Sequence, residues 1–302
     1  MWERRPSRAK VIVAFAAVYL IWGSTYLAIR YAIETIPPFL MAAVRFLTAG
    51  SLLCLWARLS GSTTRKEESW AAALIVGFLL FLVGNGGVVL AEQWVPSGLA
   101  ALTVSTTPFW IAMLEWAAPG GKRPGVQVVL GILIGFCGVT LLVDFDDLRP
   151  GAAVDAKGAG LLLLSSLSWS AGSLYARRVH ISLSPIMVSG MQMLGGSMFL
   201  TAASWIAGEL RGFNPESISM FSLLALGYLT IFGSIVAFTA YSWLVKASTP
   251  SRLATYAYVN PAVAVFLGWA VAGEPITPRT LFAMALIVTA VMVITITKPK
   301  MG

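Results

Sequence analysis

The feature that most constrains this 302-residue chain is an internal duplication in which each copy holds five apolar stretches. Aligning the two halves places Trp22 on Trp169 and the segment 96–100 on the segment 250–254. Because five is an odd number of membrane crossings, the second copy must insert in the opposite direction to the first. Inverted repeats of this kind are typical of secondary transporters, in which two similar bundles open alternately to either side of one central site.

The composition excludes a soluble domain of this size. Hydrophobic residues make up 58% of the chain, charged residues 11%, and the mean hydropathy is +0.81. A helical crossing needs about 20 apolar residues, and the alternating pattern of a membrane β-barrel is absent. We therefore expect an all-α membrane protein with ten transmembrane helices. The predicted spans are 11–29, 38–57, 70–91, 97–116, 125–143, 158–177, 185–207, 220–244, 252–272 and 279–297.

The distribution of charge predicts the orientation in the membrane. Most of the 21 basic residues fall on one side of the predicted spans, including Lys10 before the first span and Lys298 after the last. Acidic residues favour the other side, with Asp144 and Asp155 in its longest loop. The positive-inside rule then places both termini in the cytoplasm. The net charge of +8 is explained by this asymmetry and does not indicate a nucleic-acid partner.

The sequence contains neither a catalytic motif nor a cluster of residues that could bind a metal. Cys54 and Cys137 lie within apolar spans, and His180, the only histidine, falls in a predicted cytoplasmic turn. The HExxH and GxSxG motifs of hydrolases do not occur. We therefore expect no disulfide, no metal, no cofactor and no enzymatic activity.

Polar and aromatic side chains inside the spans belong either to helix contacts or to a transport pathway. In several spans these side chains recur at helical spacing, which places them on one face of the predicted helix. These faces are Tyr19, Trp22, Tyr26 and Arg30 in the first span; Phe78, Phe81, Asn85 and Glu92 in the third; Gly227, Ser234, Phe238 and Tyr241 in the eighth; and Tyr256 and Asn260, with Tyr258 on a neighbouring flank, in the ninth.

Trp22 and Trp169 take equivalent places near the middle of their spans. Approaching from opposite sides of the membrane, the two rings could form the floor and roof of a cavity that holds a flat or apolar group. The alternative is that both are ordinary helix contacts. The predicted substrate-binding residues are Trp22, Tyr26, Phe81, Asn85, Trp169, Phe238, Tyr241, Tyr256, Tyr258 and Asn260.

Arg45, Pro108 and Pro261 are the candidates for structural or gating roles. A guanidinium in the middle of a span costs about 2.5 to 3.5 kcal/mol on insertion scales unless it is paired or hydrated, so Arg45 should face the interior. It could bind backbone carbonyls and hold the fold together, or attract a carboxylate of the substrate. Each proline removes a backbone donor in mid-span and could serve either as a gating bend or as a static kink.

The acidic residues near the span ends are expected to cap helices or to reach the membrane surface. These residues are Glu92, Glu115 and Glu274, and none is expected to carry protons. Gly131 and Gly135 form a Gly-x-x-x-Gly pattern in the fifth span, which predicts close helix packing rather than a site.

Two segments carry a resemblance to a known family. They are IWGSTYLAIRYAIETIPPFLMAAVRFLTAG, at residues 21–50, and YVNPAVAVFLGWAVAGEPIT, at residues 258–277. Both resemble EamA-type proteins of the drug/metabolite transporter superfamily, and the resemblance extends over essentially the whole chain. It implies a ten-helix protein of the bacterial inner membrane built from two EamA repeats around a central cavity. The repeats would be residues 1–143 and 158–302, joined by a periplasmic linker loop at 144–157.

The expected function is export of small neutral or zwitterionic metabolites, amino acids first, by alternating access through the central cavity. The partners would be the small-molecule substrate and the lipid bilayer, with the chain acting as a monomer. Efflux of multiple drugs or toxic compounds is the alternative. A drug exporter with a carboxylate in its first helix is disfavoured, because none lies between Val11 and Ile29. A membrane-embedded enzyme and a passive channel are further alternatives.

Overall fold

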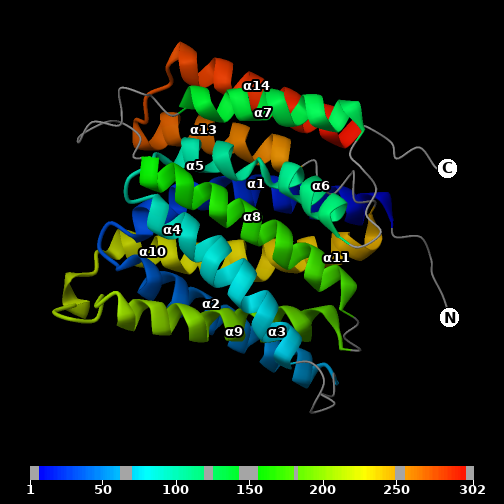
Figure 1. Ribbon diagram of the computed structural model, residues 1–302. Coiled ribbons are helices and arrows are strands. Elements are labelled where there is room, and N and C mark those ends of the chain that lie inside the picture. Colours follow the sequence, from blue (N-terminus) through cyan, green and yellow to red (C-terminus); the bar gives the residue numbers. More distant parts are fainter. Residues whose placement is uncertain are drawn as a thin grey trace.

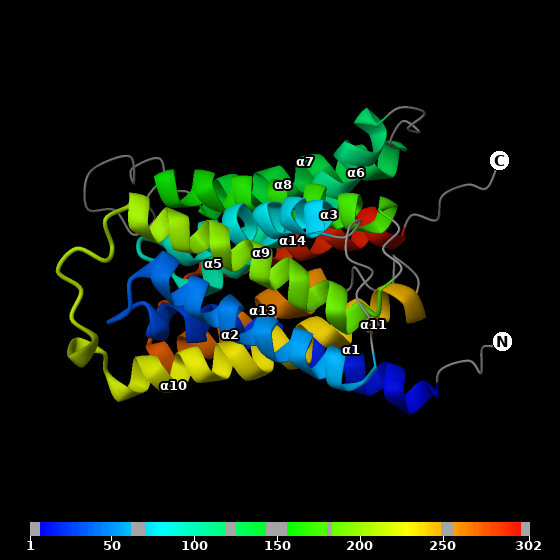
Figure 2. The same ribbon diagram turned by 90° about the horizontal axis from the view of Figure 1, so that it is seen from below.

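The protein folds into a bundle of helices that run side by side along one axis (Figures 1 and 2). The structure, a computed structural model, describes residues 7–61, 70–118, 125–142, 156–179, 183–248 and 256–296, and all regular elements within these ranges are helical. Helix α1 begins, and helix α14 ends, at the same end of the bundle. We call this the proximal end and the opposite one the distal end.

Two of the described spans contain π-helical segments, η1 and η4. In chain order the elements are α1 (Arg8–Ala32), α2 (Pro38–Leu59), α3 (Trp70–Val76), η1 (Gly77–Gly86), α4 (Gly87–Ala91), α5 (Ser97–Val104), α6 (Thr107–Ala117), α7 (Val126–Leu142), α8 (Ala156–Arg178), α9 (Pro185–Ile206), the 3₁₀ turn η3 (Pro215–Ser217), α10 (Met220–Tyr228), η4 (Leu229–Val236), α11 (Ala237–Ala247), α13 (Tyr256–Ala272) and α14 (Pro278–Ile296).

Within the described ranges, six helical stretches are both long and apolar enough to cross a membrane. They are Arg8–Ala32, Pro38–Leu59, Trp70–Ala91, Ser97–Ala117, Pro185–Ile206 and Met220–Leu244. The sequence-based spans agree with them to within a few residues. The first helix is longer than predicted because it extends beyond its apolar centre, where the Ser7 hydroxyl accepts a hydrogen bond from the Lys10 amide at 3.4 Å.

Equivalent helices of the two halves pack directly against each other. Helix α2 lies along α9, and α7 lies along α14 (Figure 1). Between α2 and α9 the backbones nearly touch, since a Cβ added to Gly50 would lie 2.9 Å from the carbonyl oxygen of Gly190. Between α7 and α14 a Cβ on Gly135 would lie 3.2 Å from Ala290. The predicted close packing of the glycine pattern in the fifth span is thus confirmed at Gly135.

The two mid-span prolines have different surroundings. Pro108 lies in the first turn of α6, directly after a break at Ser105 and Thr106 that separates α5 from α6. Pro261 lies inside α13, which continues through it without interruption. Proline fits the first turn of a helix without losing a hydrogen bond but removes one in the interior, so the equivalent positions of the two halves are not locally alike.

Candidate substrate-binding site

A cavity of about 90 Å³ lies in the middle of the bundle, between residues of both halves. Ligand pockets typically measure about 300 to 1,000 Å³, so a substrate would need this cavity to widen. The side chains and backbone around it come from α1, α2, η1, α4, α5, α6, α8, α9, η4, α11 and α13. The lining residues are Trp22, Thr25, Tyr26, Ile29, Arg45, Phe46, Phe81, Gly84, Asn85, Val88, Val104, Thr107, Ser165, Trp169, Met193, Gly233, Ser234, Phe238, Tyr256 and Asn260.

An aromatic cluster closes the cavity on the proximal side. Trp22 is its centre, with ring centroids 4.9 Å from Tyr241, 5.6 Å from Tyr256 and 6.0 Å from Trp169. The Trp22 indole also donates a hydrogen bond to the carbonyl oxygen of Gly233 at 3.2 Å. We use the name aromatic cluster for Trp22, Trp169, Tyr241 and Tyr256. Its rings meet mostly edge to face, the arrangement that aromatic quadrupoles favour.

The tryptophans do not form a floor and a roof in this conformation. The planes of Trp22 and Trp169 are nearly perpendicular, at 88°, and the rings are in contact. A planar group could therefore not lie between them unless they separated. The sequence predicted correctly that both lie in the middle of the bundle but could not give the angle between their rings, because that angle depends on the packing of neighbouring helices.

Arg45 is buried at the cavity, and only part of its guanidinium group is hydrogen-bonded. Its Nε donates to the hydroxyl of Ser234 at 2.8 Å, and its Cζ lies 4.8 Å from the ring centre of Phe46. Its Nη1 is buried and has no hydrogen-bond partner. Arg45 thus holds η4 against α2 through Nε and keeps a charged donor available to a ligand. Both roles considered from the sequence are compatible with this geometry.

Asn85 supplies an unused acceptor to the same cavity. Its Oδ1 is buried without a partner. The other predicted amide, Asn260, is used internally: in the orientation that satisfies its neighbours, its side-chain nitrogen donates to the carbonyl oxygens of Tyr19 and Tyr256, both at 3.2 Å. Because buried polar groups nearly always have partners, the free atoms of Arg45 and Asn85 indicate a place for a polar ligand or for water.

The two π-helical segments lie at equivalent places in the two halves and both contribute to the cavity. Segment η1 provides Phe81, Gly84 and Asn85, and η4 provides Gly233 and Ser234. Long π-helical segments are rare and occur often at functional sites. They widen the turn and change which residues share a face. For this reason Phe78, expected beside Phe81, is 42% exposed and packs against Phe199 instead.

Most of the predicted binding residues lie around the cavity. Eight of the ten line it, and Tyr241 does not. Tyr241 packs against Trp22 and Phe238 in the layer behind. The side chain of Tyr258 lies outside the described residues. This placement brings the predicted residues together, and their role in binding a substrate stays a prediction.

Some lining residues were missed by the sequence analysis because they are small. Thr25, Thr107 and Ser165 border the cavity, together with Gly84 and Gly233. Ser165 belongs to a serine-rich run on α8 that donates to backbone carbonyls of neighbouring helices, including Val83 at 3.2 Å. The abundance of serine in that span was the only available signal, since serine is equally common in plain helix contacts.

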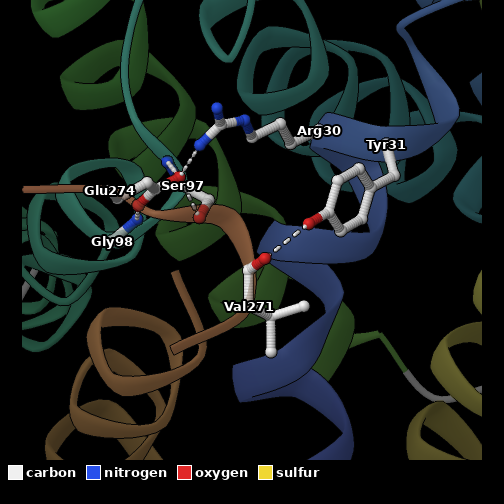
Figure 3. A network of polar contacts seen from close by, with 6 residues as sticks. All are labelled: Arg30, Tyr31, Ser97, Gly98, Val271 and Glu274. Carbon is white, nitrogen blue, oxygen red and sulfur yellow. Dashed lines mark hydrogen bonds and ion pairs between the residues drawn. The ribbon is translucent and has the colours of Figure 1, made fainter. Parts of the chain in front are cut away.

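The distal side of the cavity is closed by a polar network that joins both halves (Figure 3). Glu274, in the connection between α13 and α14, accepts hydrogen bonds from Ser97 Oγ at 2.7 Å, from the Ser97 amide at 3.0 Å and from the Gly98 amide at 3.1 Å. It also forms an ion pair with Arg30 at 2.5 Å. We call Arg30, Ser97, Gly98 and Glu274 the distal clasp.

The carboxylate of Glu274 caps helix α5, which is one of the two roles expected from the sequence. Two amides at the N-terminus of a helix carry partial positive charge and favour an anion. Burial of the carboxyl by itself would raise its pKa, but the hydrogen bonds from Ser97 and Gly98 and the contact with Arg30 lower the pKa of Glu274 below its usual value. The clasp is therefore fully formed with Glu274 ionised.

A second carboxylate strengthens the distal end in the same way. Glu209, after α9, accepts from the amides of Phe39 at 3.0 Å and Leu40 at 2.9 Å, the first turn of α2. Nearby, Tyr31 donates to the carbonyl oxygen of Val271 at 3.3 Å. At this end, loops of the second half thus hold the starts of two helices of the first half.

Glu92 contradicts the expectation that it caps a helix or reaches the membrane surface. Its side chain is buried, with the residue 7% exposed, and neither carboxyl oxygen has a hydrogen-bond partner. It follows the last turn of α4, one turn beyond the cavity-lining Val88. Proximity to the end of a span was a poor guide here, because Arg30 of α1 and Glu274 of the second half lie near this position.

Comparison with known proteins supports the assignment of a family. The profile of the EamA-like transporter family matches residues 9–144 and again residues 156–296. The chain belongs to the EamA-like transporter family. This EamA-like transporter is 40% identical to the uncharacterized inner membrane transporter YedA of Escherichia coli K12, over 94% of this chain and 90% of YedA.

More distant matches agree with this assignment. The chain is 25% identical to the uncharacterized transporter YvbV of Bacillus subtilis, over 97% of this chain and 93% of that protein. It also matches a protein crystal structure with a TM-score of 0.68 at 22% identity, over 96% of this chain and 99% of the other. That likeness shows a shared fold. EamA-like transporters are membrane transporters, and no match indicates a catalytic family.

Proposed function

We propose that this EamA-like transporter exports amino acids, aromatic and apolar ones included, from the cytoplasm through the central cavity. The observation that carries the proposal is the pair of unpartnered atoms at the cavity, Arg45 Nη1 and Asn85 Oδ1, beside the aromatic rings of Trp22 and Trp169. A guanidinium matches a carboxylate, an amide oxygen matches an ammonium group, and the rings match an apolar side chain.

The same observation disfavours export of cationic drugs. Arg45 places a positive charge at the cavity, and the described lining residues include no carboxylate to offset it. A cationic ligand would meet this charge in a region of low dielectric constant, where repulsion is strong. A zwitterion can instead align its carboxylate with Arg45.

For the membrane arrangement, we propose ten crossings in inverted repeats, a monomer, and both termini in the cytoplasm. The distal end would then face the outside, and the structure would correspond to an outward-closed state. The asymmetric distribution of Lys and Arg supports this orientation. Labelling of single cysteines at Lys10 and Lys298 by impermeant reagents tests it, and labelling of either position from the outside of intact cells would contradict it.

The test of function is a counterflow screen in proteoliposomes. Vesicles loaded with one unlabelled amino acid are expected to accumulate the same labelled amino acid, with saturation, and loading across the amino acids identifies the preferred side chain. Vesicles containing Arg45→Met protein are the matched control for specific transport. Saturable exchange of a cationic drug with none of any amino acid would overturn the proposal. Flux that does not saturate would indicate a channel.

A further inference from the structure

The buried carboxyl group of Glu92 has no role in the binding site or in the distal clasp. The residue is 7% exposed, and both oxygens are fully buried without a hydrogen-bond partner. It lies between the cavity, which ends one turn earlier at Val88, and the clasp at the distal surface. In proteins an isolated ionised carboxylate is rarely kept in such a place, because the loss of hydration is not compensated.

The charged groups around Glu92 make no hydrogen bond with its carboxyl group. Tyr26 and Arg30 face it from α1, Arg45 from α2, and Glu274 from the connection before α14. Arg30 is paired with Glu274, and Arg45 donates through Nε to Ser234. The backbone amide of Arg30 faces Glu92 without the geometry of a hydrogen bond. On the adjacent α8, the charged residue in the first turn is the exposed Lys157.

These surroundings favour the neutral form of Glu92 in the closed state. Burial opposes the charged form, and the ionised Glu274 opposes it as well, while the two arginines act in the opposite direction without contacting the carboxyl group. If the distal end opened, water would reach Glu92 and hydrate its carboxylate. The ionised form would then cost much less than it does in the closed conformation.

We propose that Glu92 is a proton-binding site whose protonation accompanies closure of the distal end. In the step, one proton from distal water binds to a carboxylate oxygen of Glu92 and gives a neutral carboxyl group, which the clasp then buries. Reopening to water on either side allows the same O–H bond to break and release the proton. The link between this step and amino-acid export rests on the proposed function.

The first experiment measures distal opening without any substrate. A cysteine replaces Val88 at the cavity, in protein that carries Cys54→Ala and Cys137→Ser, and an impermeant thiol reagent is added from the distal side only. Labelling is measured between about pH 5 and pH 9, which covers ordinary and strongly raised pKa values of glutamate. Labelling of Glu216→Cys, at an exposed distal position, corrects for the reactivity of the thiol.

The expected result is that corrected labelling of Val88→Cys falls as the pH is lowered, by up to about tenfold per pH unit for a single proton. Adding Glu92→Gln, which imitates the neutral form, should make labelling low and independent of pH. Adding Glu216→Gln, the same chemical change at an exposed carboxyl group, should leave the pH dependence as it was. Labelling that varies with pH equally in the presence of Glu92→Gln, or not at all in the parent, would overturn the proposal.

The second experiment asks whether the proton drives transport. In proteoliposomes, amino-acid uptake driven by a pH gradient is divided by counterflow measured without a gradient. For Glu92→Gln this ratio should fall to the value obtained when uptake is measured with no pH gradient applied. An unchanged ratio would overturn the coupling. If the parent protein moves no amino acid at all but Val88→Cys labelling depends on pH through Glu92, the proposed function fails and the proton site stands.

Discussion

The two ends of the central cavity are closed by different kinds of contact. At the distal end, Glu274 and Glu209 accept directed hydrogen bonds from the first amides of α5 and α2. At the proximal side, closure depends on ring contacts around Trp22. A hydrogen bond to a carboxylate depends on distance and direction, so it is lost once its two partners separate. Aromatic rings can slide past each other with only a small loss of contact energy at each step. We therefore expect the distal end to open in one step, while the proximal side can widen gradually.

The largest expected effect concerns Arg45, which lines the cavity between these two ends. Arg45→Met should weaken transport by about 10- to 100-fold in apparent affinity, because a hydrogen bond to a charged group contributes about 1.5 to 3 kcal/mol. At a pH low enough to keep Glu92 neutral, labelling of Val88→Cys from the distal side should change little, since Arg45 takes no part in the distal clasp. The measurement is the concentration dependence of counterflow. A change confined to the maximal rate would assign Arg45 to holding η4 rather than to binding the substrate.

The distal closure is tested by removing its carboxylate. Glu274→Ala leaves the amides of Ser97 and Gly98 without their partner and should destabilise the closed state by about 1 to 3 kcal/mol. Arg30→Met should cost less, about 0.2 to 1 kcal/mol, because the Arg30 side chain is 37% exposed. Thermal unfolding and distal labelling of Val88→Cys measure the two effects, with Glu216→Ala as the control. Equal effects of Glu274→Ala and Arg30→Met would show that the ion pair, not the helix cap, holds the clasp.

The proximal closure is tested at the centre of the aromatic cluster. Trp22→Phe keeps a ring but removes the hydrogen bond to Gly233, and the expected loss of stability is about 0.5 to 1.5 kcal/mol. Because ring contacts adapt, we expect little change in distal labelling and a shift in the preference among aromatic and aliphatic amino acids. Thermal unfolding and the counterflow screen provide the measurements. A large rise in distal labelling would mean that the two ends are not separate closures.

The smallest expected effect is a loss of thermal stability at low pH. The pKa of Glu274 is lowered in the folded protein, so its contribution to stability is complete above the pKa of the unfolded chain, about 4.3, and is lost as the pH falls through the lower folded value. Thermal stability of the parent should therefore decrease below about pH 4 more steeply than that of Glu274→Gln. Parallel decreases would show that other carboxyl groups dominate.

Much of the architecture follows from local sequence patterns, whereas the clasp does not. Helix bounds and the cavity faces of Trp22, Tyr26 and Asn85 follow from apolar length and helical spacing, since these are properties of single spans. The partners of Glu274 lie 177 and 244 residues away in the chain, and nothing near Glu274 in the sequence identifies them. Its position after a span left a helix cap and a place at the membrane surface as alternatives, and did not identify the helix that it caps.

The errors at Phe78 and Glu92 have physical causes that a single sequence conceals. Phe78 was placed on the cavity face by counting 3.6 residues per turn, and the π-helical segment η1 does not keep that count. Glu92 was assigned to the membrane surface from its place near the end of a span. Whether such a position is exposed depends on which residues from distant parts of the chain, here Arg30 and Glu274, lie near it, and this is a property of the tertiary structure.

The π-helical segment η1 also determines which way Glu92 faces. An α-helix turns the chain by about 100° per residue, whereas the wider turn of a π-helix rotates it by less, so the ten residues of Gly77–Gly86 do not leave Glu92 where ten residues of α-helix would. A relative in which this segment is a regular α-helix of the same length would therefore present the residue equivalent to Glu92 on another side of the span, even though the length and hydropathy of the span and the letter E are all retained.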